Sequence, residues 1–128
     1  MHRSRLAGFI IDCRTDDLDA ATRFWAGALG MPGIERDGDH YDRLDAAARD
    51  LAIEVQRVQH DSRLHLDIET DDLDAEAARL EALGATKVAF VKRWWVMEAP
   101  TGQRFCIIRA KQPLHGAAGA NVWPDSPG

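Results

Sequence analysis

Short runs of alternating apolar and polar residues dominate the hydrophobic pattern of this chain. Residues 6–14 and 64–69 are two such runs, and alternation over this length is typical of a strand with one face against a core. In the second run the apolar residues Leu64, Leu66 and Ile68 lie on the side predicted to pack against a helix. His65, Asp67 and Glu69 lie on the other side. Further runs at residues 51–56, 88–91, 94–98 and 104–109 predict more strands.

The first two runs are each followed by the same hexapeptide, Thr-Asp-Asp-Leu-Asp-Ala, at residues 15–20 and 70–75. Apolar residues then recur every three or four positions up to a Leu-Gly pair, which predicts helices over residues 17–29 and 72–83. An Asp at each helix start can accept hydrogen bonds from free backbone N–H groups. The hexapeptide lacks the ligand spacing and central glycine of a calcium loop, so helix capping is favoured over calcium binding.

A strand, a helix and further strands thus occur twice, which predicts an α+β chain of two tandem β-α-β-β-β units at about residues 6–58 and 64–110. Asp37-Gly38 is suited to a tight hairpin turn between two strands of residues 34–44. Residues 1–110 are expected to form one domain. Residues 111–128 are rich in Gly, Ala and Pro, and we expect an irregular tail with Trp123 as its anchor.

Composition and charge narrow the range of partners. With 29% charged residues and a net charge of −5 at pH 7, the chain has no basic stripe for nucleic acid or an anionic membrane. The apolar run behind the basic opening stops at Asp12, too early for a secretion signal or a membrane span. Cys13 and Cys106 both lie in strand-like runs, which favours reduced thiols in a cytoplasmic protein.

The repeated units resemble the vicinal oxygen chelate superfamily of glyoxalases, bleomycin-resistance proteins and extradiol dioxygenases, most closely its glyoxalase-like domain branch. The resemblance covers roughly residues 6–110 and is carried by the sequences at residues 17–19, 24–25, 29–30, 65–67, 72–74, 80–85 and 99–106. It implies two units whose mixed sheets curl around a shared cleft. It also implies a small-molecule ligand, a homodimer and, in catalytic members, a divalent metal ion.

The resemblance also implies positions for metal ligands. Seven residues before the Asp that starts each helix, the family's ligand position is occupied by His65 in the second unit and by Ile10, which cannot bind a metal, in the first. The last-strand position holds Cys106 where metal-binding members carry Glu. In the first unit, Glu54 or Gln56 corresponds. The expected metal ligands are therefore His65 and Glu54, for a zinc, nickel, manganese or iron ion.

Strand alternation independently places a set of polar residues on faces that look away from the helices. This set, His65, Asp67, Glu69, Glu54, Gln56 and Cys106, could line one ligand-binding site. Imidazole, carboxylate and thiolate together suit zinc, although Cys106 among apolar neighbours also fits a buried small hydrophobe. Trp94 and Trp95 point to opposite faces of one strand, so one ring is expected in the core and the other against a ligand.

Two classes of function remain open at this point. In the first, a metal polarises a small oxygenated substrate while Glu54 or Glu69 moves a proton, as in a lyase or isomerase. An extradiol dioxygenase is disfavoured by Ile10 and Cys106, because its iron needs two His and one carboxylate. In the second, the protein binds or sequesters a small molecule without metal or turnover, or has only an accessory role. His65 would then hydrogen-bond Asp67, Glu54 or a ligand oxygen.

Overall fold

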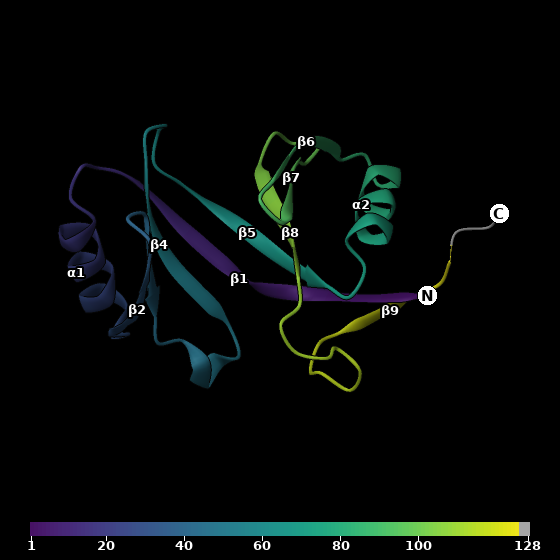
Figure 1. The fold of residues 1–128 in the computed structure, drawn as a ribbon, viewed down its shortest axis with the longest axis horizontal. Coiled ribbons are helices and arrows are strands. Elements are labelled where there is room, and N and C mark those ends of the chain that lie inside the picture. The colour runs from purple at the N-terminus through teal and green to yellow at the C-terminus, as the bar shows by residue number, and fades with distance from the viewer. Residues whose placement is uncertain (126–128) are drawn as a thin grey trace. The chain divides into compact units, whose positions relative to one another are not determined.

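The computed structural model describes residues 1–125 of the chain and has two α-helices and nine strands within them (Figure 1). In chain order the elements are β1 (His2–Arg14), α1 (Leu18–Leu29), β2 (Gly33–Asp37), β3 (Tyr41–Leu44), a 3-10 turn (Ala47–Arg49), β4 (Ala52–Val58), β5 (Arg63–Thr70), α2 (Leu73–Ala82), β6 (Thr86–Val91), β7 (Trp94–Glu98), β8 (Arg104–Arg109) and β9 (Asn121–Trp123). The predicted α+β fold with two β-α-β-β-β repeats is confirmed. Residues 126–128 of the predicted tail lie outside the described residues.

The chain divides into two compact units. The N-terminal unit is Ala7–His65, and the C-terminal unit combines Met1–Leu6 with Leu66–Gly128. Strands of the N-terminal unit follow the order β2-β3-β4-β1, with β1 and β4 parallel and the other pairs antiparallel. Strands of the C-terminal unit follow the order β5-β8-β7-β6, with β5 and β8 parallel. Both sets of four strands are therefore mixed in direction, as predicted.

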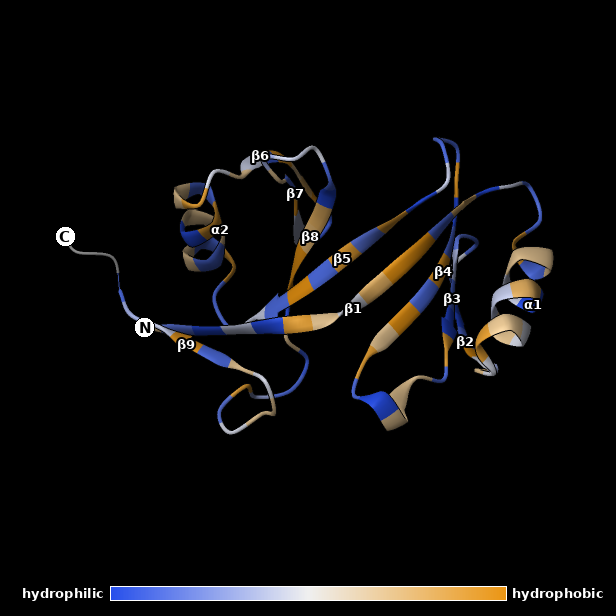
Figure 2. Cartoon of the chain, turned by 180° about the vertical axis from the view of Figure 1, so that it is seen from behind, coloured by the Kyte–Doolittle hydropathy of each residue, from blue (hydrophilic) through white to orange (hydrophobic). Residues whose placement is uncertain are grey.

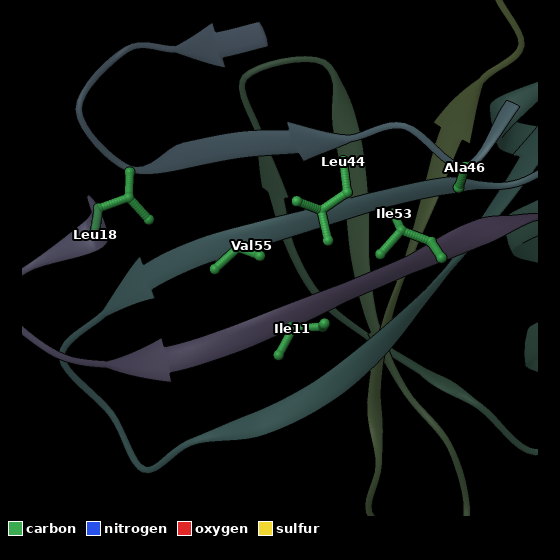
Figure 3. Packing of buried hydrophobic residues seen from close by; sticks show 6 residues of the cluster. All are labelled: Ile11, Leu18, Leu44, Ala46, Ile53 and Val55. Carbon is green, nitrogen blue, oxygen red and sulfur yellow. The ribbon is translucent and has the colours of Figure 1, made fainter. Parts of the chain in front are cut away.

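The core of the N-terminal unit lies between α1 and one face of its sheet. Apolar and polar residues alternate along β4 (Figure 2), and Ile53 and Val55 turn to the same side as Ile11 of β1. Figure 3 shows these residues with Leu44 of β3 and Leu18 of α1. Fully burying an aliphatic side chain stabilises a fold by roughly 1.5–3 kcal/mol, so this cluster is what fixes α1 to the sheet.

Both helices begin as the repeated hexapeptide predicts. The side chain of Asp17 accepts a hydrogen bond from the backbone N–H of Ala20, and Asp72 does the same for Ala75. Helix α1 ends at Gly30, whose φ of 67° is the left-handed conformation that glycine adopts without steric cost. The Asp clusters therefore act as helix caps.

Some apolar residues predicted to pack against the helices are exposed. Leu64 and Leu66 of β5 are 60% and 51% exposed, because α2 packs chiefly against β6, β7 and β8, and its core cluster takes Ile68 from β5. Three helix-stripe residues, Phe24, Leu29 and Leu83, are also exposed. The apolar stripe predicted for each helix thus includes residues that lie outside the buried face of that helix.

Strands β1 and β4 approach each other closely at Gly8. This glycine is paired with Ala52, and a Cβ atom added to it would lie 1.8 Å from the Ala52 carbonyl oxygen. No side chain fits at that distance without separating the two strands. The parallel pairing of β1 with β4, which also includes Ile11 and Asp12, thus depends on glycine at position 8.

We expect Gly8→Ala to destabilise the protein by at least about 1–3 kcal/mol, the usual cost of overpacking a closely packed site. Urea denaturation gives the free energy of unfolding. Gly27→Ala is the matched control, because Gly27 lies within α1 with no neighbour within 4 Å of an added Cβ, and alanine there favours the helix by about 1 kcal/mol. Equal stability of the two variants would contradict the expectation.

The predicted irregular tail contains a strand. Residues Asn121–Trp123 form β9, which pairs antiparallel with the start of β1, so that Trp123 lies opposite His2 (Figure 1). Leu114, in the connection before β9, is 3% exposed. The alanine- and glycine-rich composition did not indicate this strand, because its pairing partner lies at the opposite end of the chain.

A buried carboxylate, Glu76 of α2, joins this C-terminal strand to the helix. His2 Nε2 and Arg79 Nε lie 2.8 and 2.7 Å from Glu76 Oε1, and Arg79 Nη2 donates to Oε2. The Arg79 guanidinium lies over the Trp123 ring, 3.9 Å from its centroid, and Trp123 Nε1 donates to Ser4. Burial raises the pKa of Glu76, but hydrogen bonds from Arg79, His2 and Ser4 outweigh it, so the pKa lies below its ordinary value of 4.5.

Because this pKa is lowered on folding, the ionised Glu76 stabilises the fold above about pH 4.5, and the contribution is lost as the pH falls through the folded-state pKa. We expect Glu76→Gln to cost about 1.5–3 kcal/mol at pH 7. The difference from the wild type should shrink at more acidic pH, as measured by urea denaturation across the range. Glu81→Gln is the matched control. Glu81 is also on α2, but its ion pair with Lys87 of β6 is half-exposed, so this variant should change stability by less than about 1 kcal/mol.

Candidate functional site

Polar side chains gather on the face of the N-terminal sheet that α1 leaves uncovered. Asp12 of β1 lies opposite Gln56 of β4, which in turn lies opposite Tyr41 of β3, and Gln56 Nε2 donates to the Tyr41 hydroxyl at 2.9 Å. In the neighbouring row Glu54 lies between Ile10 and Arg43. The register therefore places the predicted residues Glu54 and Gln56 on the face opposite the helix, as expected.

A buried carboxylate lies behind His65. His65 Nδ1 is 2.7 Å from Asp12 Oδ2, and the two side chains are 15% and 1% exposed. A carboxylate can only accept, so Nδ1 carries the hydrogen and a neutral His65 keeps its lone pair on Nε2. Asp12 was not among the residues predicted for the site. The available signal was its position two residues after Ile10, on the same side of β1.

Three groups that can ligate a metal cluster around the middle of β5. Asp67 is two positions from His65 on this strand and is paired with Cys106 of β8. Ligand atoms of His65, Asp67 and Cys106 all lie within 4.8 Å of one another, and the three residues are half-buried. The predicted metal ligands were His65 and Glu54. This group contains His65, but its other two members are Asp67 and Cys106.

The two cysteines lie in different surroundings, and neither of them forms a disulfide. Cys13 packs against the apolar core under α1, and burial raises the pKa of its thiol despite a hydrogen bond to Trp25. A thiol of that kind is a poor nucleophile and metal ligand. Cys106 instead lies beside a carboxylate and an imidazole, which fits a ligand role better than the alternative of a buried small hydrophobe.

Glu69, predicted as a proton-transfer residue, forms an ion pair within the C-terminal unit. Arg5 Nε donates to Glu69 Oε1 at 2.7 Å, and both side chains are less than 20% exposed. Arg5 also donates to the carbonyl of Ala118. Proton transfer by Glu69 would require breaking this pair, so the arrangement favours a structural role for it.

Trp94 and Trp95 take opposite faces of β7, as predicted. Trp95 packs in the core beneath α2, where it also contacts the Phe90 ring at 5.0 Å between centroids. Trp94 therefore shares the other face with Val96, which is paired with Cys106. Of the two predicted ligand-contact rings, Trp94 is the one on the same face as Asp67 and Cys106.

Comparison with known proteins identifies the family of this chain. A profile of the glyoxalase-like domain matches residues 8–108. The fold is similar to methylmalonyl-CoA epimerase from Mycobacterium tuberculosis (19% identity, 88% of this chain and 92% of that chain, TM-score 0.61). It is also similar to the Mn(II)-bound glyoxalase from Novosphingobium aromaticivorans (17% identity, 85% of this chain, TM-score 0.62), of which it spans 40%.

A third similar structure is a glyoxalase/bleomycin resistance protein/dioxygenase superfamily member from Vibrio splendidus 12B01, with 13% identity over 81% of this chain and 97% of that chain and a TM-score of 0.56. No curated protein matches the sequence. No helix in residues 1–125 is long and apolar enough to cross a membrane. Because the domain profile extends over most of its length, the chain belongs to the glyoxalase-like domain family of the vicinal oxygen chelate superfamily.

Proposed function

We propose that this chain binds a small oxygenated molecule beside a divalent metal ion held by His65, Asp67 and Cys106. The observation that carries the proposal is the convergence of one nitrogen, one oxygen and one sulfur ligand atom within 4.8 Å. Each comes from a half-buried side chain, a position from which it can reach both an ion and a substrate.

The donor set fits zinc best among the expected metals. Imidazole, carboxylate and thiolate are the three ligand types of zinc sites, and a thiolate disfavours manganese, which prefers oxygen ligands. Three protein ligands leave one coordination position open, the pattern of catalytic zinc sites. A metal ion bound here would supply Lewis-acid polarisation of a substrate oxygen.

The surrounding residues suit a small substrate with neighbouring oxygen atoms. Trp94 offers a flat apolar wall on the Cys106 face, and Gln56 with Tyr41 offers hydrogen-bonding groups. Glu54 and Glu69 are the candidates for moving a proton, and for Glu69 this would require breaking its ion pair with Arg5. These roles support a lyase or isomerase. An extradiol dioxygenase remains disfavoured by Ile10 and Cys106.

The alternative function is metal-free binding or sequestration of a small molecule, as bleomycin-resistance proteins perform, or an accessory role without turnover. It is favoured by one observation: the Asp12 carboxylate already provides His65 with a hydrogen-bond partner without a metal. The acidic residues Glu54 and Asp67 would then select a cationic ligand, as would Glu69 if it left Arg5, and the Trp94 ring would contact an aromatic one. Metal uptake separates the two proposals.

We expect protein purified without chelator to contain about one zinc per chain and to accept cobalt in its place. Cobalt should give a sulfur-to-metal charge-transfer absorption that Cys106→Ser abolishes and His65→Ala weakens, since each removes a ligand. Cys13→Ser is the matched control and should keep the band, because Cys13 lies in the apolar core. No metal by elemental analysis, with no cobalt band in the wild type, would favour the metal-free alternative.

A ligand at this site should raise the melting temperature by mass action. A thermal-shift screen of metabolites and antibiotics, with and without zinc, would identify its class. His65→Ala should lose the shift while melting as a cooperative unit, because His65 is on a strand face outside both apolar core clusters. If His65→Ala largely unfolded the protein but its folded fraction kept the ligand affinity of the wild type, the site would lie elsewhere.

We further propose a cytoplasmic homodimer. The outer strands β2 and β6 are exposed along their whole length, and such edges are commonly covered by a partner chain. Light scattering at tens of micromolar protein should give twice the 14.2 kDa chain mass. A monomer mass there would contradict this proposal.

A further inference from the structure

We propose that Asp12 is a positioning residue, which holds His65 in the tautomer and orientation that present Nε2 to the metal and substrate. This inference rests on the proposed function of the His65, Asp67 and Cys106 group. It adds a residue that neither the strand pattern nor the family resemblance assigned to the site.

The hydrogen bond between His65 and Asp12 favours one position for the proton of neutral His65. Asp12 Oδ2 lies 2.7 Å from Nδ1, and an ionised carboxylate offers no hydrogen to donate. Nδ1 therefore bears the hydrogen and Nε2 bears the lone pair. A metal-binding histidine whose other nitrogen donates to a carboxylate is fixed in ring orientation, and such partners are worth about 10–100-fold in metal affinity.

Asp12 itself is held rigidly. It lies in β1, where its neighbours Ile11 and Cys13 pair with Val55 and Arg57 of β4, and its side chain is 1% exposed. Arg63 lies near the same carboxylate, with its Nε 3.8 Å from Oδ2. The paired strand fixes the backbone of Asp12, and from there its buried carboxylate can hold an imidazole in one orientation.

Stability alone does not account for an acid at this position. Asp12 Oδ1 is buried and has no hydrogen-bond partner among the described residues, so half of the acceptor capacity of the carboxylate is unused. Burying a carboxylate costs free energy that an apolar residue of similar size would not incur. Glu76, the other fully buried acid, differs in that both its oxygens accept hydrogen bonds. A carboxylate at position 12 is therefore costly for stability, which a role in positioning His65 would account for.

The test is the tautomer of His65, read by nitrogen-15 NMR of histidine-labelled protein at a pH of about 8, where an ordinary imidazole is neutral. The chain has five histidines, so the His65 signals are assigned by their loss in His65→Gln. We expect the wild type to show a protonated Nδ1 and an unprotonated Nε2. In Asp12→Ala and Asp12→Leu the signals should shift toward the other tautomer or an average of the two. The leucine variant keeps the site filled if the alanine variant folds poorly.

The second readout is zinc affinity by competition with a chromophoric chelator. Both Asp12 variants should bind about 10–100-fold more weakly than the wild type. Asp42→Ala is the matched control, because Asp42 is a buried acid of the same unit that pairs with Arg36 and Thr22. Its variant should lose stability but keep the His65 signals and the zinc affinity.

Two outcomes would overturn the inference: a wild-type His65 protonated on Nε2, or folded Asp12 variants whose His65 tautomer and zinc affinity are unchanged. A tautomer shift without loss of zinc affinity would also overturn it, because Asp12 would then be only a structural partner. If the wild type binds no zinc, the proposed function fails. The tautomer comparison in metal-free protein still decides whether Asp12 positions His65.

Discussion

Each unit of this protein has one helix to cover its strands, and a helix can bury only one face of them. The helix-covered faces collect aliphatic residues into two separate cores, under α1 and under α2. The opposite faces carry the candidate site residues: Asp12, Glu54 and Gln56 in one unit, Asp67 and Cys106 in the other. Because side chains alternate along a strand, core residues and candidate site residues follow one another in the sequence.

Two fully buried acids show how differently a fold can treat the same functional group. Glu76 is surrounded by His2, Arg79 and Ser4, and it joins the C-terminal strand to α2. Its charge is compensated, so it contributes to stability at neutral pH. Asp12 has an imidazole on one oxygen and no recorded partner on the other. One oxygen of this buried carboxylate is therefore without a hydrogen bond, and the proposed role in positioning His65 would account for it.

Membership of the glyoxalase-like domain family establishes the fold but not a reaction. The similar structures include an epimerase and a Mn(II)-bound glyoxalase, each less than 20% identical to this chain. Ile10 and Cys106 depart from the ligand pattern that the family resemblance implies, and the donors grouped around β5 offer a softer set. Zinc is therefore proposed from the donor atoms of this chain and not from the metal of a similar structure.

Local sequence determined much of the fold, because alternation and helical periodicity act over a few residues. It gave two β-α-β-β-β units, helices capped by Asp17 and Asp72, and the sides on which Glu54 and His65 lie. Only tertiary structure decided that α2 leaves Leu64 and Leu66 exposed, that Trp95 is the core ring, and that Trp123 pairs with the first strand. The Asp12–His65 hydrogen bond joins residues 53 positions apart. No local pattern encodes such a contact, because it depends on strand register and the approach of distant segments.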